Sequence, residues 1–246
     1  FIPSVSKGNV KVSDNIEGFF YDSVAKNEDS VIIVYKNDQR VYYNIQGRAR
    51  KFKLPDEAQN VNYYQDKKDE LLLPGEKVIA ISNSEMKMNG ESFELNNPKI
   101  KKKVNIVSEN VFKTDEYGVP LKSTSNGFIA EDIDADGRKK EYLFLPTYGA
   151  ASLNHNTINI KDNPWMPNNW VGKKGRFDKK SADIITYGYS ITAHKSQGSE
   201  WDKVFVIPDP PFRYPTLNPR WLYTAITRAK NNLVLQRIPD YATYKS

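Results

Sequence analysis

Val31-Ile32-Ile33-Val34-Tyr35 is an unbroken run of apolar and mostly β-branched residues. Such a run is typical of a strand that is buried on both faces of a parallel sheet. The segment Asn15–Lys26 before it and the segment Val41–Arg50 after it both have apolar residues at helical spacing. In the first of these segments the residues at that spacing are Ile16, Phe19, Phe20 and Val24. A helix, a buried strand and a second helix in this order predict an α/β fold.

The middle of the sequence has a different character. Between residues 66 and 162, short apolar runs alternate with turns that contain Gly, Pro and Asn, which predicts a small barrel or curled sheet inserted into the α/β fold. The strands expected there are Lys77–Ile81, Val104–Val107, Gly127–Ala130 and Glu141–Leu145. After a linker at residues 163–180 the α/β character returns. The strands expected in this last part are Ile184–Ile185, Val204–Ile207 and Leu233–Leu235.

The composition limits the classes of function. With 246 residues, of which 39% are hydrophobic, the chain is long enough for one large folded domain or two smaller ones. The absence of cysteine excludes disulfides and thiolate metal sites and fits a reducing compartment. His155 and His194 are too few for a zinc site. Asp132, Asp134 and Asp136 are spaced as in a calcium loop, but the required later Glu is missing, so we expect a hairpin turn and no metal site.

The net charge is 36 − 30 = +6, a moderate bias towards polyanionic partners. No apolar run approaches the roughly 20 residues of a membrane-spanning helix, and no secretory signal is found, so we expect no membrane partner and a cytoplasmic location. The chain begins with Phe1 and contains no G-x-x-x-x-G-K-[ST] phosphate loop. These two features lead us to expect a piece of a longer protein.

The segment Thr192-Ala193-His194-Lys195-Ser196-Gln197-Gly198-Ser199-Glu200-Trp201 follows a short apolar strand. We expect it to begin with a short helix that Gly198 ends in a left-handed conformation. Thr192, His194 and Lys195 then lie at a strand-to-helix junction, where free backbone N–H groups and a positive helix end favour a phosphate. For a junction of this kind taken alone, an ordinary polar crossover loop is the alternative.

A second segment with polar chemistry is Trp221-Leu222-Tyr223-Thr224-Ala225-Ile226-Thr227-Arg228-Ala229-Lys230. We expect Asn218 to cap the start of a helix whose first residue is Pro219. Arg228 then stands at the C-terminal end of that helix, and its planar, permanently charged fork suits a terminal phosphate. Taken alone, an arginine at a helix end can equally be a solvated charge or a partner of the helix dipole.

Together these two segments resemble the last two signature motifs of superfamily-1 helicases, in the form found in the RecD/Dda-like branch. The segment Val31–Arg48 is similar to the motif that opens the second motor domain of these helicases, and its polar positions are Asn37, Asn44 and Arg48. The sequence departs from that motif at Arg40, where many relatives have an apolar residue.

The resemblance covers residues 10–54 and 181–238 and is weaker between them. Within that middle part, Pro74–Val78 and Leu95–Asn97 resemble the opening of the SH3-like insertion of RecD and Dda.

The resemblance implies a RecA-like α/β motor domain of the P-loop NTPase type, called 2A in the family, with an inserted SH3-like β-barrel domain, called 2B. The implied boundaries are residues 1–65 for the first part of 2A, 66–165 for 2B and 166–246 for the second part of 2A. The parent protein would be an ATP-dependent DNA helicase that moves 5′→3′. It would act in DNA replication, repair or recombination, in the cytoplasm of a bacterial or phage-infected cell.

The resemblance also implies which residues meet each ligand. The residues that would bind single-stranded DNA are Thr192, His194, Lys195 and Asn37. The residues that would lie near ATP are Gln197, Gly198, Glu200 and Lys36, the last where some relatives carry a second phosphate-binding arginine. Arg228 would be an arginine finger that stabilises charge during phosphoryl transfer. ATP and Mg²⁺ would be bound mainly by the N-terminal helicase domain, the expected partner besides DNA and replication or recombination proteins, so this chain alone is expected to be inactive.

Three questions stay open at the level of sequence. The chain could instead be a non-catalytic, helicase-like module that binds nucleic acid or partners within a nuclease or replication complex. An intact phosphate loop upstream of Phe1 would support the motor over this alternative. The motifs do not separate DNA from RNA, whose recognition uses the 2′-hydroxyl. Two basic clusters and two tryptophans could contact nucleic acid, although solvated surface and core packing are the simpler interpretations. They are Lys99 with Lys101–Lys103, then Lys173, Lys174, Arg176, Lys179 and Lys180, and finally Trp165 and Trp170.

Overall fold

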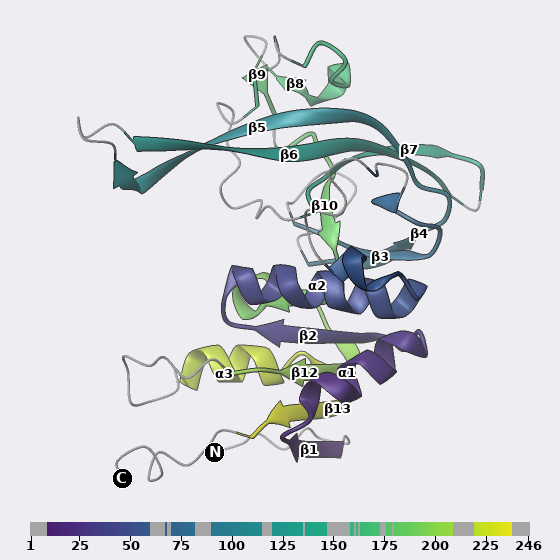
Figure 1. The fold of residues 1–246 in the computed structure, drawn as a ribbon, viewed down its shortest axis with the longest axis vertical. Helices are drawn as coiled ribbons and strands as arrows, with labels where there is room; N and C mark the ends of the chain where they lie inside the picture. Colours follow the sequence, from purple (N-terminus) through teal and green to yellow (C-terminus); the bar gives the residue numbers. More distant parts are fainter. Residues whose placement is uncertain are drawn as a thin grey trace. The chain divides into compact units, whose positions relative to one another are not determined.

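A computed structural model describes residues 9–59, 67, 70–81, 90–114, 120–134, 136–146, 158–159, 161, 163–172, 176–178, 180–208 and 219–237. The chain divides into two compact units. One unit is formed by Phe1–Asn60 with Gly188–Ser246, and the other by Val61–Tyr187. Figure 1 labels most of the helices and strands of each unit.

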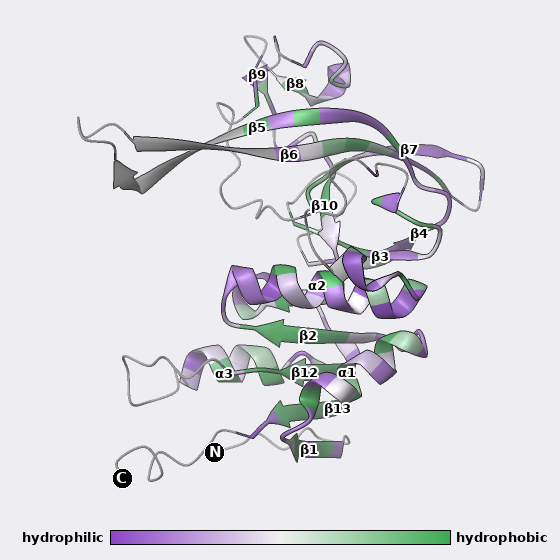
Figure 2. Ribbon diagram, in the orientation of Figure 1, coloured by the Kyte–Doolittle hydropathy of each residue, from purple (hydrophilic) through white to green (hydrophobic). Residues whose placement is uncertain are grey.

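The first unit contains a five-stranded parallel sheet with the strand order β1-β13-β12-β2-β11. Its strands are β1 (Asn9–Ser13), β2 (Ser30–Val34), β11 (Ser190–Thr192), β12 (Trp201–Val206) and β13 (Ala229–Gln236). All five residues of β2 are buried, and Figure 2 shows this strand as largely hydrophobic. The prediction of a buried strand in a parallel sheet is confirmed, and the sheet with its helices is consistent with a RecA-like fold.

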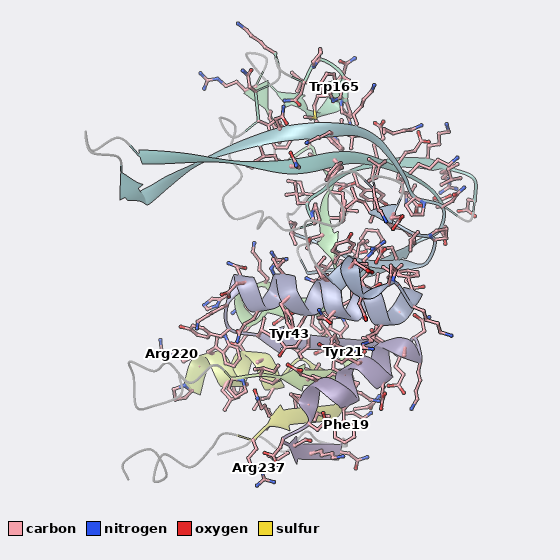
Figure 3. All side chains as sticks on the ribbon, viewed as in Figure 1. Phe19, Tyr21, Tyr43, Trp165, Arg220 and Arg237 are labelled. Carbon is pink, nitrogen blue, oxygen red and sulfur yellow. The ribbon has the colours of Figure 1, made fainter. Side chains whose placement is uncertain are left out.

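Three α-helices belong to this unit in the part of the chain that the structure describes: α1 (Ile16–Ala25), α2 (Asn37–Phe52) and α3 (Pro219–Ile226). The two helices expected around β2 are therefore confirmed. Asn15 caps the start of α1, and its side-chain oxygen accepts a hydrogen bond from the Gly18 N–H at 3.1 Å. Phe19 lies outside the buried face of α1, because 37% of it is exposed and the Lys11 ammonium stands 3.6 Å from its ring centre. Figure 3 labels this side chain.

Asn44 fastens α2 to the edge strand β11. This side chain is fully buried, and its Oδ1 accepts hydrogen bonds from the backbone N–H groups of Tyr189 at 2.9 Å and Ser190 at 2.8 Å. Its Nδ2 donates to the Ser190 carbonyl at 3.1 Å. The helix approaches closely here, since a Cβ atom at Gly47 would lie 2.9 Å from the Tyr189 Cβ. Asn44 thus fixes the start of the segment that carries the site.

We expect Asn44→Ala to lower the free energy of unfolding by about 2–4 kcal/mol, because it leaves three buried backbone groups without their partner. Urea unfolding measures the change. Asn37→Ala is the matched control, since Asn37 is an exposed first residue of the same helix and its loss should cost less than about 0.5 kcal/mol. Equal effects of the two substitutions would contradict the role of Asn44.

The second unit contains a six-stranded sheet with the order β4-β3-β10-β7-β6-β5. Its strands are β3 (Glu76–Ala80), β4 (Ser92–Leu95), β5 (Lys99–Thr114), β6 (Pro120–Ile133), β7 (Lys139–Phe144) and β10 (Ile184–Tyr187). Only β10 and β7 pair in parallel, and the other neighbours are antiparallel. The four strands expected in this region fall on β3, β5, β6 and β7. A separate pair, β8 (Val171–Gly172) and β9 (Arg176–Phe177), follows a turn of 3₁₀ helix at Asn168–Trp170.

One predicted strand belongs to the other sheet. Ile184–Ile185 was expected to reopen the α/β domain, but Ile184 and Ile185 pair with Leu143 and Phe144 of β7, and Ile185 also pairs with Ala80 of β3. The division between the units accordingly falls after Tyr187 and not after residue 165. An apolar strand buried on both faces fits either sheet, so its sequence does not say which sheet it joins. The described strands form a linear order with β4 and β5 at the edges, and the SH3-like barrel stays a prediction.

The acidic turn between β6 and β7 is a hairpin turn, as expected. The Asp134 Oδ1 accepts hydrogen bonds from the backbone N–H groups of Asp136 at 3.0 Å and Arg138 at 2.9 Å, and these bonds lower the pKa of the Asp134 carboxyl. Gly137 has a φ of 78°, which glycine adopts without strain. Within the described ranges, no group of three or more His, Asp or Glu side chains could hold a metal. None of the described helices is long and apolar enough to cross a membrane.

Candidate nucleotide and nucleic-acid interface

The candidate site lies where two neighbouring parallel strands end. Val34, the last residue of β2, pairs with Thr192, the last residue of β11. Because the strands are parallel, the chain leaves both at the same edge of the sheet, called here the carboxyl edge. Lys36 and Asn37 follow β2 as exposed residues at the start of α2, and His194 follows β11. The structure therefore places the predicted strand-binding residues of both segments on one edge.

The segment after β11 forms a single turn of 3₁₀ helix, Ala193–Lys195. The Ser196 N–H donates to the Thr192 carbonyl at 3.1 Å, and the Ser196 hydroxyl donates to the Ala193 carbonyl at 2.7 Å. Ala193 and Ser196 are buried, Thr192 is half-buried and His194 is exposed. The expected helix is therefore shorter than predicted. Three residues make too short a helix for an appreciable dipole, so side chains rather than a helix end must supply positive charge.

Gly198 has a φ of 90°, which confirms the predicted left-handed conformation. Gln197 and Glu200 on either side of it are exposed. The conformation at Gly198 turns the chain into β12, which begins at Trp201.

Arg228 follows α3 and reaches back to this segment. Its Nε donates to the Thr224 carbonyl at 3.1 Å, one terminal nitrogen donates to the Ser199 carbonyl at 3.3 Å and the other to the Thr227 hydroxyl at 2.9 Å. The Trp201 N–H also donates to the Arg228 carbonyl at 2.9 Å. A guanidinium has five N–H donors, so 5 − 3 = 2 remain for an anion. The predicted position at a helix end is confirmed for Arg228, while Asn218, the expected cap of that helix, lies outside the described residues.

Residues 187–236, which hold β11, the 3₁₀ turn, β12, α3 and β13, match the family model of the UvrD-like helicase C-terminal domain. This part of the chain is therefore similar to the C-terminal domain of UvrD-like helicases. The match includes the segment from Thr192 to Trp201 and the segment from Trp221 to Lys230. It does not distinguish the RecD/Dda-like branch from other branches.

Two solved structures are also similar to this chain. The Pif1 helicase from Candida albicans is 13% identical with a TM-score of 0.38, and the match covers 95% of this chain and 51% of the Pif1 chain. The Bacteroides Pif1 bound to ssDNA is 16% identical with a TM-score of 0.29, and the match covers 91% of this chain and 48% of the Pif1 chain. The chain thus spans about half the length of these relatives.

Two residues at the carboxyl edge were not predicted to belong to the site. Arg40 is buried in the first turn of α2, although the sequence showed only that it replaces an apolar residue. Burial lowers the pKa of Arg40 to about 10, and burial together with the Arg40 charge lowers the pKa of the Lys195 ammonium. Tyr35 lies just beyond β2, 47% exposed, with its ring centre 5.7 Å from that of Trp221. Two sequence signals could have identified these residues. Arg40 is charged at a position that is apolar in many relatives, and Tyr35 is an aromatic residue at the end of a predicted strand.

The other candidate contacts are distributed over the second unit. Lys101 is exposed and pairs with Glu131 at 3.3 Å, and its neighbours Lys102 and Lys103 are exposed. Lys173, Lys174 and Lys179 of the second basic cluster lie outside the described residues. Trp170 is buried, as core packing requires, whereas Trp165 is 43% exposed and is labelled in Figure 3. Their contact with nucleic acid stays a prediction.

Proposed function

We propose that this chain is the second motor domain of an ATP-dependent superfamily-1 DNA helicase of the RecD/Dda-like branch, with an inserted SH3-like domain. The observation that carries the proposal is the hydrogen bond from Arg228 to the Ser199 carbonyl, because it joins in one place the two motifs within the residues that match the helicase family model. Such a domain closes on the domain that holds the phosphate loop when ATP binds, and reopens when products leave.

In this proposal single-stranded DNA lies along the carboxyl edge. The residues that contact its phosphates are Thr192, His194, Lys195 and Asn37. Thr192 ends β11, His194 and Lys195 follow it, and Asn37 follows the neighbouring β2. Contacts of this kind position the strand without reading its sequence. Their affinity therefore falls as salt rises, by a slope of about 0.7 per phosphate contact for a single strand.

ATP lies on the other side of the turn in this proposal, near Gln197, Gly198, Glu200 and Arg228. The phosphate-loop domain supplies most of the contacts to ATP and Mg²⁺, and Lys36 adds a cation from the start of α2. The two remaining N–H donors of Arg228 would meet charge that develops on the transferred phosphoryl group. The whole protein would translocate 5′→3′ in replication, repair or recombination, in the cytoplasm of a bacterial or phage-infected cell.

Fluorescence anisotropy with a labelled oligo(dT) tests the proposal. The wild-type chain should bind weakly, and the affinity should fall as salt rises and change little with base sequence. Tight binding that is insensitive to salt, or a strong sequence preference, would contradict phosphate contacts along the carboxyl edge.

His194→Ala should weaken this binding by about three- to tenfold, because it removes an exposed hydrogen-bonding group from the strand path. In the two-domain protein the same change should raise the ATP consumed per base pair opened. Lys26→Ala is the control: Lys26 is an exposed cation at the end of α1, shortly before β2 begins, and therefore at the opposite edge of the sheet. An equal loss of affinity in the two variants would show that oligo(dT) binds without preference for the carboxyl edge, and would contradict the proposed strand path.

A further inference from the structure

Arg40 carries a charge that the described part of the chain does not compensate. Only 6% of this residue is exposed. Its guanidinium makes no hydrogen bond or ion pair with any residue that the structure describes, and its backbone N–H donates to the Lys36 carbonyl within α2. The half-buried Lys195 ammonium likewise has no anionic partner among the described residues. Arg40 lies in the first turn of the helix that follows β2, and Lys195 ends the 3₁₀ turn that follows the neighbouring β11. Because the ends of these two strands pair, both cations lie at the carboxyl edge, and the Arg40 charge lowers the pKa of the Lys195 ammonium.

Two neighbouring cations that are partly or fully buried raise the free energy of the folded chain unless an anion binds them. Burial removes hydration from the guanidinium, and the ammonium adds repulsion. The pKa of Arg40, although lowered to about 10, still lies well above neutral pH, so the charge persists in the folded chain. A single anion bound to both groups relieves the lost hydration and the repulsion together. The pair is therefore suited to an anionic ligand.

The shapes of the two groups fit a phosphate. A guanidinium presents a planar fork to two oxygen atoms, and an ammonium is a compact point charge that can meet a third. Arg40 is one turn into α2 after β2, and Lys195 is at the end of the 3₁₀ turn after β11, the strand next to β2. We propose that Arg40 and Lys195 together bind one phosphate of the nucleic-acid strand.

This inference rests on the proposed function and adds to it a residue that departs from the helicase motif. The phosphate is assigned to the strand and not to the nucleotide because Lys195 continues directly from Thr192 and His194. Arg228, the group proposed to meet ATP, is bonded instead to the Ser199 carbonyl, beyond Gly198. A strand that lies along the carboxyl edge would therefore meet the Arg40–Lys195 pair beside its other contacts.

The test compares Arg40→Leu, Arg40→Lys and a control, Arg50→Ala, in the same chain. Arg50 is exposed and lies ten residues further along α2, about 15 Å away, so its loss removes the same charge from the same helix. Anisotropy with labelled oligo(dT) over a salt series gives the affinity and its salt slope. Urea unfolding gives the stability of each variant.

We expect Arg40→Leu to weaken strand binding about tenfold at low salt and to reduce the salt slope by about 0.7, the loss of one phosphate contact. Its unfolding midpoint should stay the same or rise, because an unpartnered buried charge is replaced by an apolar side chain. Arg40→Lys should keep the slope and lose part of the affinity, since it keeps the charge without the fork. Arg50→Ala should change neither.

Wild-type affinity and slope in Arg40→Leu would overturn the inference while leaving the proposed function in place. If the wild-type chain shows no salt-dependent strand binding, the proposed function fails first, and the inference fails with it. Weaker binding of ATP with unchanged strand binding would assign the phosphate to the nucleotide and overturn the strand assignment. If Arg40→Leu does not fold, Arg40→Lys decides: lower affinity at wild-type stability supports the inference, and lower stability at wild-type affinity overturns it.

Discussion

If the proposed function holds, Arg228→Ala should lower kcat for ATP hydrolysis by about 10³–10⁵ in a protein that joins this chain to a phosphate-loop domain. The reason is that the proposed contact acts on charge that grows only in the transition state, so the loss appears in kcat and hardly in nucleotide affinity. Single-strand binding should stay near that of the wild type, because Arg228 lies with residues 197–201 and not with the proposed strand contacts. Steady-state kinetics with saturating oligo(dT) measures the change.

The substitution also removes three hydrogen bonds that tie Arg228 to Thr224, Ser199 and Thr227, so its effect on folding has to be measured beside its effect on rate. Urea unfolding of the variant gives that effect. Arg220→Ala is the matched control, since Arg220 is an exposed arginine at the opposite end of α3 and should leave kcat unchanged. A near-normal kcat in folded Arg228→Ala would show that this helix end does not face the nucleotide.

The parts of the fold that were predictable from the sequence depend on local patterns. The run Val31–Tyr35 predicts a strand buried on both faces, and β2 indeed has a neighbouring strand on each side and five buried residues. Gly198 was predicted to be left-handed because the residue type itself permits that conformation, and its φ is 90°. Arg228 was placed at a helix end by the expected helix start at Pro219, and α3 begins at that residue. Each of these features is decided within about ten residues.

The parts that were not predictable depend on which distant segments meet. Ile184–Ile185 has the composition of a buried strand, but only its pairing with β7 and β3 assigns it to the second unit. The role of Asn44 is also invisible in the sequence, because its partners lie at Tyr189 and Ser190, more than 140 residues away. Arg40 was noticed as a departure from the helicase motif, yet its burial beside Lys195 appears only in three dimensions.

This 246-residue chain should show no DNA-stimulated ATP hydrolysis above background. Phosphoryl transfer requires a cradle of backbone N–H groups around the phosphates and a lysine on them, and the sequence contains no phosphate loop to supply these. Arg228 can stabilise charge only on a phosphate that is already held opposite it. Addition of a phosphate-loop domain, on the same chain or as a separate protein that binds it, should therefore be needed for turnover.

The same Arg228→Ala variant makes this expectation testable despite traces of contaminating ATPases. Hydrolysis by a contaminant is the same in wild-type and variant preparations purified in parallel, because it does not depend on this side chain. A DNA-stimulated rate that is present in the wild-type chain and absent from the variant would belong to the chain itself. It would show that these residues form a complete active site, and the proposed division of a motor into two domains would have to be abandoned.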